Sequence, residues 1–168
     1  MVQTRGYNGF SYADIAETVG IRTSSVHHHF PGKGDLGQEV ASRYRRAFGE
    51  ALAGIESDTD DRIARLERYA ELYARQLSKH GRMCLCGMLA AEYATLPAPV
   101  QGEVRGFFDD QRAWLARVLD GGRRPAADAQ RRADVLLAGL EGAMLVARTD
   151  GNVPHFRRIA RALVDAVA

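Results

Sequence analysis

The segment GYNGFSYADIAETVGIRTSSVHHHFPGKGDL, residues 6–36, decides the fold of the first part of this chain. Ser11 is placed to cap a helix, and Gly20 suits the left-handed conformation that often ends one. Between them, apolar residues follow the spacing of an amphipathic helix, at Tyr12, Ile15, Ala16 and Val19. A second short helix is predicted over residues 23–29, because Phe30-Pro31-Gly32 stops it. Two short helices joined by a glycine turn are typical of a helix-turn-helix, which lays one exposed helix in a DNA major groove.

The second predicted helix has an inward and an outward face. Because successive residues turn by about 100°, Val26 and Phe30 point toward the first helix, where the small Ala16 allows a close crossing. The outward stripes consist of Thr23, Ser24, His27 and His28. Hydroxyl and imidazole groups bond phosphates and base edges, which favours a contact with DNA. The alternative is that the two hydroxyls only cap a short helix, and both roles are compatible.

Lys33 and the three histidines allow two further hypotheses about binding. Lys33 lies just before the next helix, where free backbone amides favour an anion such as a phosphate; a solvated surface lysine is the alternative. Three consecutive helical histidines point about 100° apart, so they cannot converge on one metal ion. We therefore expect no metal site and no cofactor.

Composition is that of an ordinary folded protein and gives little support for nucleic-acid binding by itself. The 168 residues are 46% hydrophobic and 26% charged, with a net charge of only +2. No apolar run approaches the roughly 18 residues of a membrane span, and no signal-like start is present. These features predict a cytoplasmic protein without a membrane partner, and the geometry of the helices has to support the DNA hypothesis.

The remainder of the chain predicts further helices and no strands, which makes the expected fold class all-α. Two prolines, Pro97 and Pro99, are expected to end one helix, and residues 121–125 read as a loop. The expected helices cover residues 35–55, 58–79, 83–94, 100–119, 127–148 and 153–167.

Aromatic and long apolar residues of these helices can line a pocket for a flat apolar molecule, although each one alone suits an ordinary core. The candidate ligand-binding residues are Tyr69, Tyr73, Met88, Phe107, Trp114 and Met144. The last two helices carry many small residues, which would suit a four-helix interface between two copies. The alternative is that these helices close the monomer's own core.

Cys84 and Cys86 are candidates for a thiol sensor. Two residues apart on a predicted helix, they point about 200° apart and cannot share a metal ion or easily form a disulfide. Arg82 and Lys79 would favour the thiolate form that reacts with electrophiles. The alternative is that both are small buried residues at a helix crossing.

Nothing in the sequence favours an enzyme. The chain has no glycine-rich phosphate loop after a strand and no pair of histidines spaced for zinc. Glu92 and Glu141 could lie in a pocket, but no neighbouring residue supplies a catalytic partner.

The head closely resembles the DNA-binding part of the tetracycline-repressor family of bacterial transcription regulators. The resemblance is carried by Gly6-Tyr7, Asp14-Ile15-Ala16, Gly20-Ile21, residues 24–33 and Leu36. It implies an all-helical homodimer that binds a palindromic operator and leaves it when a small apolar or electrophilic effector binds. By position, the residues that would face DNA are Thr23, Ser24, Ser25, His27, His28 and Lys33, with Ser11 and Tyr12 on phosphate. The family usually has tyrosine where this chain has His27.

The expected organisation is a helix-turn-helix domain over residues 1–36, linked through the helix 35–55 to a ligand-binding and dimerisation domain over 56–168. The family places a full helix before Gly6, whereas only Met1 to Arg5 precede it here. We therefore expect either that the native protein starts earlier or that its head is unstable, because Phe10, Ile15, Val26 and Phe30 would lack a cover. The alternative function is a dimeric module that binds a small molecule and is not competent to bind DNA.

Overall fold

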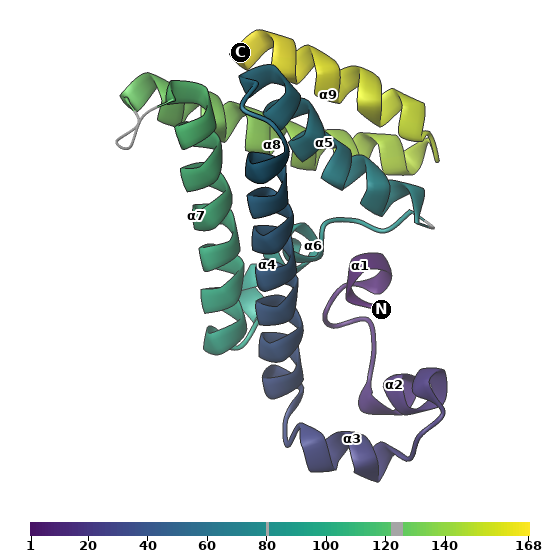
Figure 1. Ribbon diagram of the computed structural model, residues 1–168. Coiled ribbons are helices and arrows are strands. Elements are labelled where there is room, and N and C mark those ends of the chain that lie inside the picture. The colour runs from purple at the N-terminus through teal and green to yellow at the C-terminus, as the bar shows by residue number, and fades with distance from the viewer. Residues whose placement is uncertain (80, 122–125) are drawn as a thin grey trace. The chain divides into compact units, whose positions relative to one another are not determined.

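The computed structural model describes residues 1–79, 81–121 and 126–168, and every regular element in these ranges is a helix (Figure 1). The all-α prediction is confirmed. The elements are α1 (Val2–Arg5), α2 (Tyr12–Val19), α3 (Thr23–His29), α4 (Lys33–Asp58), α5 (Arg62–Ser78), α6 (Leu85–Ala91), the 3-10 turn η1 (Tyr93–Thr95), α7 (Ala98–Asp120), α8 (Ala127–Thr149) and α9 (Val153–Val167). Most of the predicted loop 121–125 lies outside the described residues.

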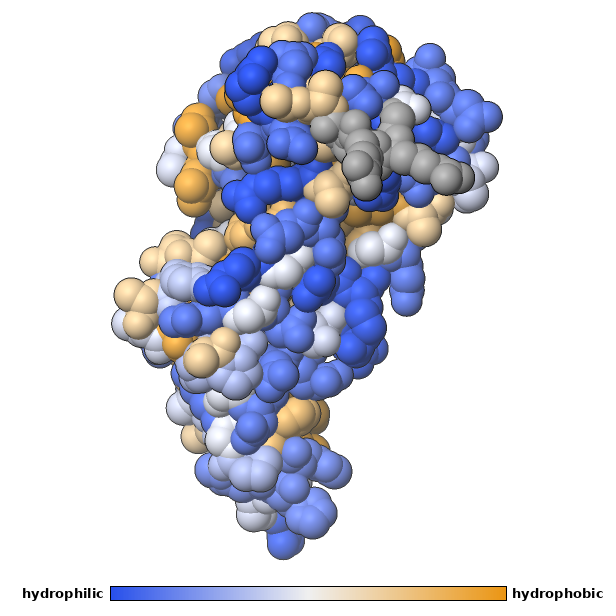
Figure 2. Space-filling view, turned by 90° about the vertical axis from the view of Figure 1, so that its left-hand side faces the viewer, coloured by the Kyte–Doolittle hydropathy of each residue, from blue (hydrophilic) through white to orange (hydrophobic). Residues whose placement is uncertain are grey.

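The chain divides into two compact units, and α4 and α7 contribute residues to both. The head unit consists of residues 1–46 and 85–107, and the body unit consists of residues 47–84 and 108–168. The head unit thus includes a segment that begins nearly forty residues after its first part ends. The face drawn in Figure 2 is mostly hydrophilic with small hydrophobic groups, as expected where the large apolar residues fill an interior.

The helix-turn-helix forms from local signals. Ser11 and Asp14 make a capping box at the start of α2: the Ser11 amide donates to Asp14 Oδ2 at 2.6 Å, and the Asp14 amide donates to Ser11 Oγ at 3.3 Å. The Ser11 hydroxyl also donates to Asp14 Oδ2, and this bond, followed by that of the Ser11 amide, lowers the pKa of the Asp14 carboxyl. Gly20 ends α2 with a φ of 76°, as its position predicted. α3 begins without a side-chain cap, so the hydroxyls of Thr23 and Ser24 do not fill the cap position considered for them.

Two local predictions were wrong. The helix expected over 83–94 is split into α6 and η1, and Met83 and Cys84, whose side chains are buried, precede α6 outside any helix. Pro99 lies in the first turn of α7 instead of blocking a helix. A proline is tolerated there because the first amides of a helix have no intrahelical acceptor.

The body unit is held by a close crossing of α8 and α9, with α5 packed on α9 (Figure 1). Gly139 of α8 makes this crossing possible, because a Cβ atom there would lie 2.7 Å from both methyl carbons of Leu163. The residues buried around it are apolar: Leu136, Leu140, Met144, Phe156, Ala160 and Val164.

We expect Gly139→Ala to destabilise the protein by about 1–3 kcal/mol, since the added methyl group overpacks the contact with Leu163. Chemical denaturation followed by circular dichroism measures this change. Gly54→Ala on α4 is the matched control, because a Cβ atom there meets nothing within 4 Å. The control should gain roughly 0.5–1 kcal/mol from the higher helix propensity of alanine. Equal effects of the two substitutions would show that the α8–α9 crossing is not tight at Gly139.

Candidate functional site

The exposed face of α3 is the first candidate site. Val26 is buried against Tyr12 and Ala16, with Ile15, Phe30 and Leu36 packed around them. The opposite face leaves Thr23, Ser24, His27 and His28 exposed, and Ser25 half-buried. The helical spacing therefore predicted correctly which side chains turn inward and which face solvent.

Tyr12 holds α2 and α3 together at this corner. Its hydroxyl donates to the backbone carbonyl of Phe30 at 3.0 Å, and its ring meets the His27 ring edge-on with centroids 4.6 Å apart. The residue is buried, and this burial raises the pKa of its phenol. Tyr12 and Ser11, the two expected phosphate contacts, are thus both already engaged within the head, Ser11 in its capping box.

Lys33 is bonded within the head as well. Its ammonium donates to the backbone carbonyl of Phe10 and lies 4.3 Å from the centre of the Phe10 ring and 4.9 Å from that of Tyr7. This arrangement ties the start of α4 to the segment before α2. A structural role for Lys33, which its sequence position did not suggest, therefore stands beside the predicted phosphate contact.

Glu92 forms a carboxylate clamp that sequence reasoning missed. It accepts hydrogen bonds from the amide of Tyr7 and, at 3.1 Å each, from the amide and the side-chain nitrogen of Asn8. The Asn8 side chain also donates to Thr95 Oγ1 at 2.8 Å. Gly6 is required beside this clamp, because its φ is 82° and a Cβ atom would lie 2.6 Å from Glu92 Oε2. Glu92 is therefore structural, and its partners are backbone amides 84 and 85 residues away.

An apolar groove of about 390 Å³ lies in the head unit, lined among others by Phe10, Val19, Leu36, Val40 and Leu85. Phe10 and Val26 are buried, so the expectation that they lack a cover was wrong for both, while Ile15 and Phe30 are half-buried. Val19, placed on the inward stripe by its spacing, is 63% exposed at the edge of this groove.

In the body unit, aromatic candidates for ligand binding lie together. Trp114 stacks on Tyr69 with ring centroids 5.5 Å apart, and the Tyr69 and Tyr73 hydroxyls are 3.1 Å apart. All three residues are buried, as is Met144. The two remaining candidates belong to the head unit, where Phe107 is buried against Tyr44 and Met88 is half-buried.

Glu141 introduces a carboxyl into the same interior. The residue is half-buried, but its Oε1 atom is fully covered and lacks a hydrogen-bond partner. Burial raises the pKa of Glu141 to about 7, and a hydrogen bond with Cys84 opposes this only in part. Burial also raises the pKa of Tyr69 and Tyr73, and the nearby Glu141 carboxylate adds to both shifts.

The two cysteines occupy different surroundings from those predicted. Cys84 precedes α6 and Cys86 lies on it, so they do not share one helix as expected. Their exposed fractions are 1% and 0%, and neither forms a disulfide bond. Among the described residues, no three histidine, cysteine or acidic side chains come together as metal ligands.

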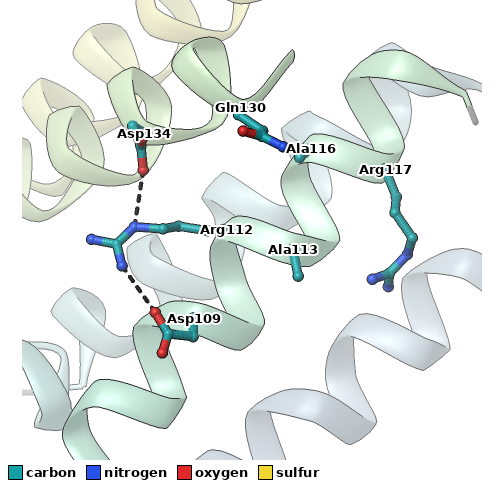
Figure 3. Close-up of a pocket in the computed structure, with 7 residues that line it drawn as sticks. All are labelled: Asp109, Arg112, Ala113, Ala116, Arg117, Gln130 and Asp134. Atoms are coloured by element: carbon teal, nitrogen blue, oxygen red, sulfur yellow. Dashed lines mark hydrogen bonds and ion pairs between the residues drawn. The ribbon is translucent and has the colours of Figure 1, made fainter. Parts of the chain in front are cut away.

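A pocket of about 440 Å³ opens between α7 and α8 of the body unit (Figure 3). Arg112 lies across it and is paired with Asp134 at 2.9 Å and with Asp109 at 3.1 Å. Arg117, at the other end, is ion-paired with Glu56 at 3.7 Å. Both arginines that border this pocket are therefore ion-paired within the protein.

A helix-turn-helix with an exposed second helix, joined to a larger helical body, is typical of transcription regulators that carry the DNA-binding head and the body in one polypeptide. A family profile described as bacterial regulatory proteins, tetR family, matches residues 1–40. A second, described as transcriptional regulator LmrA/YxaF-like, C-terminal domain, matches residues 63–162. The chain belongs to the TetR family of bacterial transcriptional regulators, and it is not an enzyme.

Solved structures agree with this assignment. A TetR-family regulator from Agrobacterium tumefaciens is 35% identical, with 99% of this chain and 91% of that chain covered and a TM-score of 0.92. A TetR regulator from Legionella pneumophila is 27% identical over the same shares, also with a TM-score of 0.92. Reduced NemR from E. coli shares the fold at 22% identity and a TM-score of 0.83, with 99% and 91% of the two chains covered. No curated protein matches the chain.

None of the helices in the described ranges combines the length and apolar character needed to cross a bilayer.

We expect the stability of the protein to fall as Glu141 ionises. A carboxyl whose folded pKa is about 7, against 4.5 in the unfolded chain, favours folding at low pH and loses this contribution as the pH rises through 7. Glu141→Gln removes the dependence, so its advantage over the wild type should grow by on the order of 2 kcal/mol between pH 5 and pH 8. Urea denaturation at both pH values measures it. The exposed Glu67→Gln control should show no such change, and a constant difference for Glu141→Gln would contradict the burial of this carboxyl.

Proposed function

We propose that this transcriptional regulator is a repressor that binds a palindromic operator as a homodimer and is released by a small-molecule effector. Proteins of its family bind DNA and small-molecule effectors and are dimeric. The observation that carries the proposal is the exposed polar face of α3, held by the buried contact of Val26 with Tyr12 and Ala16. A protein that binds operator DNA would lie in the cytoplasm, because that is where bacterial DNA is found.

The proposed DNA contacts come mainly from α3. Thr23 and Ser24 begin the helix on its exposed side, and their small side chains allow a close approach to the duplex. His27 and His28 extend the same face by one turn and suit phosphates or base edges. Ser25 completes this surface, and Lys33 keeps further N–H donors for a phosphate beside its bond to Phe10. Ser11 and Tyr12 would add phosphate contacts only by giving up their hydroxyl bonds to Asp14 and Phe30.

The proposed dimer forms through α8 and α9. An apolar stripe follows α8 with steps of three and four residues, at Val135, Ala138, Gly142 and Leu145. Val135 and Leu145 are 54% and 58% exposed, which is unusual for large aliphatic side chains on a helix of a folded unit. Small exposed residues of α9, Ala162 and Ala166, suit close packing of two helical pairs.

The proposed effector site lies among the buried aromatic residues of the body unit, Tyr69, Tyr73, Trp114 and Met144; Met88 and Phe107 of the head unit remain candidates. An effector releases DNA if it binds the free conformation more tightly than the operator-bound one. An electrophile that modifies Cys84 or Cys86 is the second form of the same proposal. Both thiols are buried, so such a reagent would reach them only through an opening of the fold.

We expect His28→Ala and Thr23→Ala each to weaken operator binding about tenfold, because a lost base or phosphate contact costs about 1–3 kcal/mol. The operator is first selected from fragments of the source genome, and binding is measured by fluorescence anisotropy at two salt concentrations. His29→Ala is the matched control, since it is a neighbouring exposed histidine outside the proposed contact set. If no fragment is retained, or if all three variants bind alike, the chain acts as a dimeric module without DNA binding through this face.

We expect Leu145→Asp to convert the dimer to monomers and to reduce operator affinity at least tenfold, because it places a charge in the apolar stripe of α8. Sedimentation equilibrium measures the change of mass. Ile63→Asp on α5, also an exposed aliphatic position in the body unit, should leave the dimer intact. A Leu145→Asp protein that remains dimeric would rule out this stripe as the interface.

A further inference from the structure

We propose that the effector is a flat aromatic amine, whose ammonium group binds Glu141 and whose ring packs beside Tyr69 and Trp114 in the body unit. This inference rests on the proposed function, in which a small molecule binds this interior, and it adds the chemical class of that molecule.

The first step is the unmet charge of Glu141. Its Oε1 atom is covered and has no hydrogen-bond partner, and Cys84 offers the carboxyl only a weak thiol donor. The titratable groups of the described residues that interact with it are Cys84, Tyr69 and Tyr73, from two segments, and none of them is a cation. A covered carboxylate without a cation is costly, so a ligand that supplies one gains both charge and hydrogen bonds.

The second step is a pair of unsatisfied groups on α7. The indole nitrogen of Trp114 and Oε1 of Gln111 are both covered and have no hydrogen-bond partner. Their residues are 3% and 1% exposed and lie one helical turn apart, so they belong to the same side of α7. Buried polar atoms nearly always have hydrogen-bond partners in folded proteins. The unpaired donor of Trp114 and the unpaired acceptor of Gln111 therefore favour a bound molecule with polar groups beside them.

The third step joins these groups through Tyr69. Its ring stacks on Trp114 with an interplanar angle of 24°, and the Glu141 carboxylate acts on its phenol. Tyr69 therefore links the two groups, because its ring stacks on the indole and the Glu141 carboxylate raises the pKa of its hydroxyl. A planar ring can pack against such surfaces, and a cation is attracted by their electron-rich faces as well as by the carboxylate. An acceptor on the far side of the ring would meet the indole N–H of Trp114.

The test uses three matched probes: 2-(4-methoxyphenyl)ethylamine, its neutral analogue 2-(4-methoxyphenyl)ethanol, and 2-phenylethylamine, which lacks the ether acceptor. Trp114 is the chain's single tryptophan, so its fluorescence reports on this site directly. We expect saturable binding of the methoxy amine, at least tenfold tighter than that of the alcohol. Because burial raises the pKa of Glu141 to about 7, the amine should also bind more tightly at pH 8 than at pH 6.

Glu141→Gln should remove the preference for the amine over the alcohol, whereas the exposed Glu67→Gln control should retain it. Trp114→Phe, measured by calorimetry, should bind the two amines alike. The inference is overturned if the alcohol binds as tightly as the amine, if Glu141→Gln keeps the preference, or if no probe binds. Operator binding is measured on the same preparation without probe. A protein that binds its operator but not the amine remains a regulator with a different effector.

Discussion

The contact of Val26 with Tyr12 and Ala16 is the constraint on which the DNA-facing surface depends. It fixes the rotation of α3, and a rotation of about half a turn around the helix axis would bury the hydroxyls and imidazoles that now face solvent. The Tyr12 hydroxyl strengthens this contact from the other end of α3 by binding the Phe30 carbonyl. A short helix without a side-chain cap thus obtains its orientation from packing and one partly buried hydrogen bond, and not from its own stability.

The body unit combines tight apolar packing with covered polar groups that have no hydrogen-bond partner. Gly139 of α8 lies so close to Leu163 of α9 that a methyl group on Gly139 would overlap the Leu163 side chain. On the same helix, one residue after the buried Leu140, Glu141 brings a carboxyl into the interior. Apolar contacts account for the fold of this unit, whereas the carboxyl, the indole of Trp114 and the amide of Gln111 add nothing to stability that an apolar side chain would not. These open groups are the ones on which the proposed effector site rests.

Local signals were sufficient to predict the helix-turn-helix, and contacts distant in sequence were not predictable. The bounds of α3 agree with the prediction because Gly20 and the Phe30-Pro31-Gly32 stop act within a few residues. Pro99 was misjudged because a proline that ends one helix looks like one that begins the next. The role of Glu92 depends on amides more than eighty residues away, and no spacing rule reaches that far. Whether the chosen α3 and body-unit residues contact DNA and effector remains a prediction.

The clamp between Glu92 and the amides of Tyr7 and Asn8 has a consequence for biosynthesis. Residues 1–46 leave the ribosome well before residues 85–107, which complete the same compact unit. Until Glu92 emerges, the turn at Gly6 lacks the carboxylate that satisfies its backbone amides. The head of this protein therefore completes its fold only after more than half of the chain has been translated, and the segment before α2 is the part that is anchored last.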